Sequence, residues 1–171
     1  MHVFLTGERG IGKSTVVRAA ARLTGRPCYG FCTRFETEDR HASALYLVPP
    51  DYNETPDPSF QAAIWQNGSL IPVDGCFDRL GVRLLKEGQR HPEGIILMDE
   101  CGHVERKEMM FRQEIAACLN GKIPVLGVLR LGQEWHDPIR RHPAVRVLTV
   151  SRENRNELPQ MVADLLMGGQ T

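Results

Sequence analysis

The sequence carries no excess charge of either sign. Lysine plus arginine and aspartate plus glutamate number 21 each, so the formal net charge at pH 7 is zero. Proteins that bind nucleic acid through an overall electrostatic field are basic, and we therefore expect no strong binding of DNA or RNA. The chain shows no signal peptide and no apolar run long enough to span a bilayer. These absences predict a protein that avoids membranes and works in the cytoplasm.

Cysteine and histidine lack the spacings that would build a cross-linked or zinc-centred protein. The five cysteines are odd in number and contain no C-x-x-C pair, and the six histidines show no H-E-x-x-H motif. These absences argue against a disulfide framework and a zinc site, and they favour reduced thiols. No G-x-S-x-G segment or cysteine–histidine arrangement points to covalent catalysis.

Short apolar runs alternate with segments of helical periodicity, a pattern typical of an α/β sheet covered on both faces. The length predicts one domain over residues 1–171. Strands are expected at 3–5, 28–33, 42–48, 94–98, 123–129 and 145–150. Helices are expected between Lys13 and Gly25, at 77–87, at 105–119, and after an N-cap at Asn156.

The region between the third strand and the second helix is harder to assign. Residues 42–48 can pair with the second strand as an antiparallel hairpin, and the Asn67-Gly68 turn suggests another short hairpin within 61–73. The proline-rich segment 49–58 is expected to be a loop, either a lid or simply mobile.

The segment Gly7 to Ser14 fits the phosphate-binding pattern G-x-x-x-x-G-K-[ST] and follows the apolar run Val3-Phe4-Leu5. Its glycines allow a tight turn that points backbone N–H groups at phosphate oxygens, and the dipole of the next helix adds partial positive charge. Lys13 is expected to reach the β- and γ-phosphates, and the Ser14 hydroxyl to bind Mg²⁺. The predicted nucleotide-binding residues here are Gly7, Glu8, Arg9, Gly10, Ile11, Gly12, Lys13, Ser14 and Thr15.

Two acids, Asp99 and Glu100, end the apolar run 94–98. A carboxylate at this place in a phosphate-loop protein helps to hold Mg²⁺, which we predict for Asp99 on the strand beside the one that feeds the glycine loop. Glu100 is expected to orient or deprotonate the water in line with the γ-phosphate. Together with Lys13 it forms the predicted catalytic pair.

Four linked segments resemble the cancer-related nucleoside triphosphatase family of small P-loop NTPases. They are GERGIGKST at 7–15, GFCT at 30–33, ILMDECGHVE at 96–105 and ENR at 153–155. The resemblance implies a compact fold like that of RecA-type ATPases and hydrolysis of nucleoside triphosphates with broad base tolerance. This chain departs from the family by having Phe35 where an acidic residue is usual, and by having His41-Ala42-Ser43-Ala44 in place of a basic, glycine-containing hairpin.

Several further residues are candidates whose ordinary structural roles stay open. Thr33 or Arg34 is placed to meet the γ-phosphate or the water, and Glu105 either acts in the site or favours a helix N-terminus. Asn154 and Arg155 follow the last strand, where P-loop folds often contact the base. The remaining candidates are Arg130, Arg140 and Arg141 as a charge-stabilising finger, Trp65 and Trp135 for stacking, and His103 near the acids.

We therefore predict a three-layer P-loop NTPase fold, with a mostly parallel sheet, helices on both faces and an antiparallel hairpin extension. The predicted activity is Mg²⁺-dependent hydrolysis of ATP, GTP and other nucleoside triphosphates to diphosphate and phosphate, by a monomer or weak oligomer. Two alternatives remain open at this point. One is a nucleotide or small-molecule kinase, and the other is a nucleotide-dependent regulatory protein with slow turnover.

Overall fold

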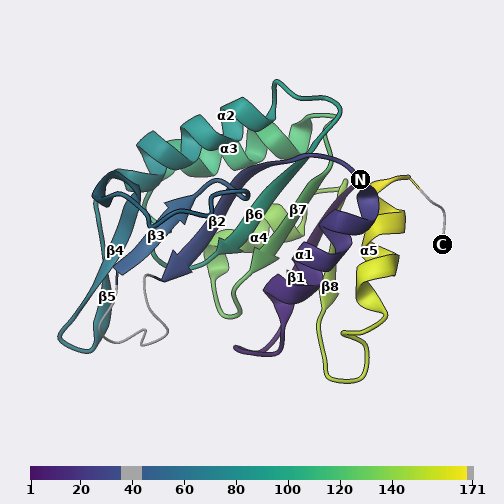
Figure 1. The fold of residues 1–171 in the computed structure, drawn as a ribbon, viewed down its shortest axis with the longest axis horizontal. Coiled ribbons are helices and arrows are strands. Elements are labelled where there is room, and N and C mark those ends of the chain that lie inside the picture. The colour runs from purple at the N-terminus through teal and green to yellow at the C-terminus, as the bar shows by residue number, and fades with distance from the viewer. Residues whose placement is uncertain (36–43, 169–171) are drawn as a thin grey trace.

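The computed structural model describes residues 1–35 and 44–168, which form one eight-stranded sheet with helices packed on both faces (Figure 1). The sheet order is β5-β4-β3-β2-β6-β7-β1-β8. The strands are β1 His2–Thr6, β2 Cys28–Phe35, β3 Ala44–Val48, β4 Gln61–Gln66, β5 Ser69–Pro72, β6 Ile95–Cys101, β7 Val125–Leu129 and β8 Val145–Thr149. The helices are α1 Lys13–Thr24, α2 Val82–Gly88, α3 Met109–Asn120, α4 Asp137–Arg140 and α5 Leu158–Leu166.

The sheet has a parallel and an antiparallel part. Five strands run parallel to one another, in the order β2, β6, β7, β1 and β8. β3, β4 and β5 continue the sheet from β2 as antiparallel strands. This arrangement confirms the predicted fold class. One part of the prediction was wrong: β6, which carries Asp99, does not lie beside β1, because β7 is inserted between them. Hydrophobic patterns locate strands but contain no information on which buried strand becomes the neighbour of which.

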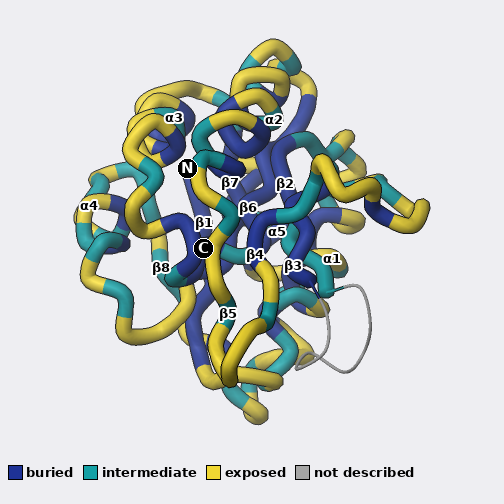
Figure 2. Tube along the Cα trace, turned by 90° about the vertical axis from the view of Figure 1, so that its left-hand side faces the viewer, coloured by how far each residue is buried: buried dark blue, intermediate teal, exposed yellow. Residues whose placement is uncertain are grey.

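Helices cover the two faces because side chains alternate along each central strand. The helices α2 and α3 cover one face, and α1 and α5 cover the other (Figure 1). On β6, Ile96 and Met98 belong to the core beneath α2 and α3, whereas Ile95 and Leu97 belong to the core beneath α1 and α5. Buried residues follow the central strands and the inner sides of these helices, and exposed residues lie on the outer loops (Figure 2). In the described residues, no helix has both the length and the apolar character that crossing a bilayer requires.

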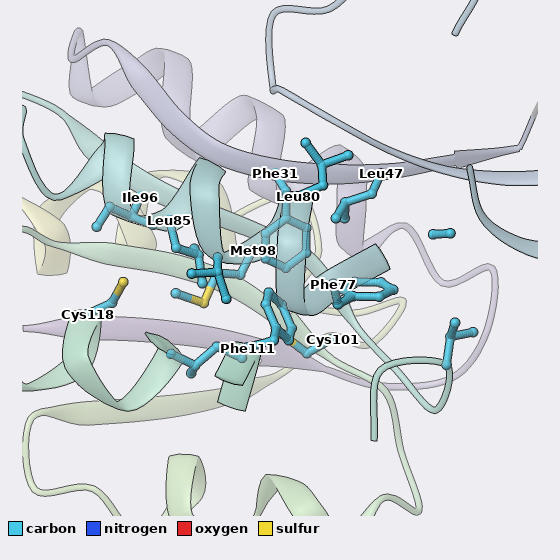
Figure 3. Packing of buried hydrophobic residues seen from close by; sticks show 14 of the residues in the cluster. Phe31, Leu47, Phe77, Leu80, Leu85, Ile96, Met98, Cys101, Phe111 and Cys118 are labelled. Atoms are coloured by element: carbon cyan, nitrogen blue, oxygen red, sulfur yellow. The ribbon is translucent and has the colours of Figure 1, made fainter. Parts of the chain in front are cut away.

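Three phenylalanines join the α2/α3 layer to the sheet (Figure 3). Phe31 from β2, Phe77 from the π-helical turn Phe77–Gly81 and Phe111 from α3 have ring centroids 5.0 to 6.4 Å apart. Each is at most 1% exposed. Aromatic pairs at these separations add edge-to-face attraction to the burial of apolar surface. This cluster packs the turn before α2 against the middle of β2.

Two helix starts differ from the predicted ones. α3 begins at Met109 rather than at Glu105, and residues 104–107 form turns instead. α5 begins at Leu158 with Glu157 as N-cap, so the prediction of Asn156 as cap was wrong by one residue. The reason is a turn in which the carbonyl of Asn154 accepts the N–H groups of Glu157 and Leu158. Pro159 lies in the first turn of α5, as expected.

The antiparallel part contains the predicted hairpin between β4 and β5. Asn67 and Gly68 occupy its turn with φ angles of 49° and 77°, values that suit asparagine and glycine. The proline-rich loop packs on the side of β3 away from α2, where Tyr52 meets Phe60 in a small cluster with Tyr46. Residues 42 and 43 of the predicted third strand lie outside the described residues. So do residues 41–43 of the segment that departs from the family's usual hairpin.

Candidate active site

The glycine loop joins the carboxyl end of β1 to the amino end of α1. Gly10 and Gly12 have φ angles of 79° and 106°, and no atom lies within 4 Å of where a Cβ would stand on either residue. Glycine is therefore required by the left-handed backbone and not by lack of space. Gly12 is the N-cap of α1 and provides no side chain to occupy the first N–H groups of the helix. These N–H groups remain available to an anion.

Lys13 is buried at the base of this loop. Its ammonium donates hydrogen bonds to the carbonyl oxygens of Gly7 at 3.0 Å and Glu8 at 2.8 Å. A lysine has three N–H donors, so one remains for a phosphate oxygen. The sequence predicted a mobile charge, whereas the structure holds the ammonium against the carbonyl groups of its own loop.

Ser14 and Asp99 lie 85 positions apart in the chain and meet at the mouth of the sheet. The Ser14 hydroxyl donates to Asp99 Oδ1 at 3.0 Å. Burial raises the pKa of Asp99 to about 6, and the hydrogen bond from Ser14 acts in the opposite direction. A hydroxyl and a carboxylate are hard oxygen ligands of the kind that Mg²⁺ prefers. The two predicted metal ligands are thus close together although β7 separates β6 from β1, the strand that leads into the glycine loop.

The donor set fits Mg²⁺ bound together with a nucleotide. In the described residues, no three His, Cys, Asp or Glu side chains gather to hold a metal ion by themselves. Mg²⁺ usually keeps several waters and is bound through one or two protein groups and the substrate phosphates. Ser14 and Asp99 would provide the protein share of such a site.

Thr33, at the end of β2, bridges the two acids of β6. Its hydroxyl donates to the carbonyl oxygen of Asp99 at 3.3 Å and accepts the N–H of Glu100 at 3.3 Å. Arg34 points elsewhere: it donates to the backbone oxygens of Tyr52 and Glu54 in the proline-rich loop. Of the two residues predicted to meet the γ-phosphate or the water, only Thr33 lines the cavity beside the glycine loop.

Glu105 is almost fully buried, at 2% exposure, and faces the same cavity. Its Oε1 accepts a hydrogen bond from the N–H of Gly102. Burial raises the pKa of this carboxyl to about 7. Because α3 begins four residues later, Glu105 does not lie at its N-terminus.

A cavity of about 700 Å³ opens beside the glycine loop and extends toward the β4–β5 hairpin. Glu100, His103 and Arg130 line it, and the Arg130 guanidinium lies 2.9 Å from His103 Nδ1. Arg140 and Arg141, the other two finger candidates, are instead paired with Asp137 on α4. Trp65 also lines the cavity, whereas Trp135 supports it from behind by donating to the carbonyl of Gly102 at 2.7 Å.

A second, smaller cavity of about 340 Å³ lies on the other side of the glycine loop. Arg155 lines it together with Arg152 and the loop residues Glu8 to Ile11. Asn154 has another role: its amide accepts from the N–H of Ser151 and donates to the carbonyl of Thr149, which closes the turn after β8. Sequence reasoning missed Arg152, because a lone arginine in a loop gives no signal of what it will face.

Comparison with known proteins shows the family of the chain. A profile of the family described as NTPase matches residues 2–163. The chain belongs to this NTPase family. It is similar to the nucleoside-triphosphatase THEP1 of Aquifex aeolicus, with 24% identity over 97% of this chain and 99% of that protein. It is also similar to the human cancer-related nucleoside-triphosphatase, with 28% identity over 92% of each chain.

Solved structures of the family share the fold. The crystal structure of THEP1 from Aquifex aeolicus matches with a TM-score of 0.77 and 22% identity, over 97% of this chain and 99% of that one. The solution structure of a human cancer-related nucleoside triphosphatase matches with a TM-score of 0.69 and 22% identity, over 99% of each. The predicted resemblance to the cancer-related nucleoside triphosphatases is thereby confirmed.

Proposed function

We propose that the chain is a single-domain, Mg²⁺-dependent nucleoside triphosphatase that converts ATP, GTP and other triphosphates to diphosphate and phosphate. The observation that carries the proposal is the 3.0 Å contact between Ser14 and Asp99. This contact joins the glycine loop to the acidic end of β6, and these are the two parts of a phosphoryl-transfer site. Ser14 and Glu100 both line the cavity beside the contact. The names of the family relatives support the same activity.

Binding of the triphosphate would rest on the glycine loop. N–H groups from Gly10 to Thr15 point a partial positive charge at the phosphates, and Lys13 adds a full charge from below. The transition state of phosphoryl transfer spreads negative charge over the γ-phosphate oxygens, so fixed positive groups stabilise it more than they stabilise the ground state. Arg130 at the cavity wall is placed to add to this stabilisation.

Ser14 and Asp99 would hold Mg²⁺, which would neutralise negative charge on the phosphates. Asp99 is kept in position by two neighbours, since Ser14 donates to its carboxylate and Thr33 donates to its carbonyl oxygen. Thr33 also fixes the N–H of Glu100, so the two acids are oriented by one hydroxyl.

Glu100 would accept the proton of the attacking water. The water oxygen bonds to the γ-phosphorus, the bond between this phosphorus and the bridging oxygen breaks, and the proton passes to the carboxylate. Glu100 is partly exposed at the cavity, whereas Asp99 is buried beside Ser14. The buried Asp99 is therefore suited to hold the metal, and the partly exposed Glu100 is suited to meet the water.

Broad base tolerance is consistent with the smaller cavity. Arg152 and Arg155 line it beyond the glycine loop. A guanidinium plane stacks on any base because every base has a π-face. We further propose that the protein acts in the cytoplasm on free nucleotides as a monomer or weak oligomer, with only weak binding of nucleic acid, in keeping with its zero net charge.

A comparison of two isosteric variants tests the proposal. Glu100→Gln should lower single-turnover hydrolysis roughly a hundredfold while leaving Mg²⁺-dependent nucleotide affinity within about twofold. Asp99→Asn should weaken both the metal-dependent affinity and turnover. Phosphate release from ATP, GTP, CTP and UTP, with and without Mg²⁺, would be measured beside equilibrium binding. Wild-type turnover in Glu100→Gln removes Glu100 from the mechanism, and turnover that is independent of Mg²⁺ removes the metal site.

A further inference from the structure

The larger cavity exceeds what hydrolysis of a triphosphate needs at its γ-phosphate end. Hydrolysis requires room for one attacking water, whose share of liquid volume is about 30 Å³. The cavity measures about 700 Å³ and extends from Lys13 and Ser14 at one end to Trp65 and Leu70 at the other. Phosphates on the glycine loop would fill only the first end. The volume as a whole is typical of a site for a small organic ligand.

The far end of this cavity has an apolar wall built by the antiparallel strands. Trp65 on β4 and Leu70 on β5 are directly opposite each other, so they share one face of the hairpin. Phe35, Leu45 and Phe77 complete the wall from β2, β3 and the turn before α2. Such a surface binds flat apolar or aromatic groups through burial and stacking.

The opposite face of the same hairpin provides an internal comparison. Ile64 and Ile71 also form a directly opposed pair, but they point away from the cavity and are 36% and 46% exposed. Side chains alternate along a strand, so one pair of this hairpin faces the cavity and the adjacent pair faces solvent. The pair supplies control positions in the same local structure.

A polar corner lies between the apolar wall and the glycine loop. A Cβ placed on Gly102 would stand 3.9 Å from Glu105 Oε2 and 4.0 Å from Glu100 Oε1, so the two carboxylates flank one residue. Oε1 of Glu105 accepts the N–H of Gly102, and Oε2 is the oxygen of this carboxylate that lies on the side of Gly102 shared with Glu100. A carboxylate has two oxygens that together accept several hydrogen bonds. Because Glu105 lines the cavity, the hydroxyl of a bound ligand can donate to it.

We propose that this cavity binds a second substrate, an aromatic molecule that carries an alcohol hydroxyl, and that this hydroxyl accepts the γ-phosphoryl group in place of water. The proposal rests on the proposed function, because the same glycine loop and acids hold the triphosphate. The aromatic ring lies against Trp65 and Leu70, and the hydroxyl donates to Glu105. Hydrolysis is then the reaction that remains when the cavity contains only water.

The transfer balances with the groups present. The hydroxyl oxygen bonds to the γ-phosphorus, and the bond between that phosphorus and the β–γ bridging oxygen breaks, which releases the nucleoside diphosphate. The hydroxyl proton passes to the Glu105 carboxylate and from there to solvent. The pKa of Glu105, raised to about 7 by burial, suits a group that takes up and returns a proton near neutral pH.

The experiment uses γ-labelled ATP with three acceptor probes: thymidine, pyridoxine and 2-phenylethanol. We expect the full-length protein to form a labelled phosphate ester of at least one probe, with ester and free phosphate together equal to the diphosphate released. The identity of the labelled probe distinguishes a nucleoside from a smaller heteroaromatic or plain aromatic alcohol. The measured quantity is the ratio of ester to free phosphate.

Matched variants connect the ester to this cavity. Trp65→Ala and Glu105→Gln should each lower the ratio at least tenfold, and Leu70→Ala should act in the same direction if Trp65→Ala does not fold. Ile71→Ala, on the outer face of the hairpin, should leave both the ratio and basal hydrolysis unchanged.

Two results overturn the proposal while leaving the proposed function in place. One is wild-type hydrolysis without a labelled ester from any probe, and the other is equal ester formation in Trp65→Ala and Ile71→Ala. A protein that neither hydrolyses ATP nor forms an ester contradicts the proposed function as well, so the two failures are distinguishable.

Discussion

The parallel and antiparallel parts of the sheet surround one cavity but are built differently. β1 and β7 are buried along their whole lengths, and β6 is buried except at Glu100. In β5, by contrast, three of four residues are exposed, and the last three residues of β4 are exposed or half-buried. The strands that lead to the proposed phosphate site are therefore fixed from both faces. The apolar wall is presented by a hairpin with one face in water, which tolerates substitution more easily.

The largest expected difference between the two parts concerns glycines with positive φ. Gly30 in β2 has φ 93°, and a Cβ there would lie 2.2 Å from the carbonyl oxygen of Leu97 on β6. Gly68 in the β4–β5 turn has φ 77° with no atom within 4 Å. Gly30→Ala should lower the free energy of unfolding by about 3–5 kcal/mol, and Gly68→Ala by about 1 kcal/mol. Equal losses in urea denaturation would contradict the steric argument.

Triphosphate affinity should depend on the parallel part alone. Lys13→Ala removes the charge that lies beneath the glycine loop and should weaken ATP and GTP binding roughly a hundredfold, while the fold is retained. Ile64→Ala on the outer face of β4 is the matched control, since that side chain does not line the cavity. Calorimetric titration would measure both variants. Unchanged affinity in Lys13→Ala would remove the loop from nucleotide binding.

Within the parallel part, His136 should contribute a loss of stability in acid. His136, between β7 and β8, is fully buried, and burial lowers its pKa to about 4. As the pH falls below 6.5, the unfolded chain takes up a proton that the folded chain resists, so stability is lost progressively down to about pH 4. The loss from this residue should reach about 2 kcal/mol at pH 5. Residues 44–72, which contain the antiparallel strands, have no histidine.

The two tryptophans allow the pH dependence of unfolding to be followed by fluorescence. Trp135 lies against the His136 ring, with centroids 4.3 Å apart, and Trp65 lies in the antiparallel part. In the Trp65→Phe background, with the emission of Trp135 as the signal in urea, the stability of His136→Phe relative to the parent should rise by about 2 kcal/mol between pH 7 and pH 5. The raised pKa values of Asp99 and Glu105 act in the opposite direction, but both groups are present in the two proteins and cancel in this difference. His136→Leu is a smaller replacement, and a difference that does not change with pH in either variant would contradict the role of His136.

The smallest expected effect belongs to the second cavity. Arg155→Ala removes an exposed guanidinium beside the glycine loop and should weaken ATP and GTP equally, by about two- to fourfold. Arg90→Ala, which removes a surface arginine paired with Glu87 at the end of α2, is the control for a general change in charge. A loss that differs strongly between ATP and GTP would show that Arg155 selects a base instead of accepting any.

Local patterns were enough to predict most elements of the parallel part. Continuous apolar runs marked β6 and β7, and the Asn67-Gly68 pair marked the outer hairpin. The insertion of β7 between β1 and β6 could not be predicted, because strand order is decided by packing between distant segments. The same holds for Thr33, whose hydroxyl is placed between Asp99 and Glu100 only by the pairing of β2 with β6.

Glu105 illustrates a different kind of limit. Its place before an amphipathic segment resembled a helix start, but its side chain folds back to the N–H of Gly102. A glutamate ahead of an amphipathic segment fits a helix start and a contact with a preceding N–H equally well. Only the burial of the Glu105 carboxylate in the folded protein decides between the two.

The outermost strand has a consequence for association between molecules. β5 is only four residues long and ends at Pro72, which has no N–H to offer a further strand. An unpaired strand at the border of a sheet is otherwise a template onto which another polypeptide adds, and brevity and proline are two devices that oppose such addition. The open border of this sheet is thus poorly suited to edge-to-edge aggregation, although the hairpin exposes Ile64 and Ile71 close by.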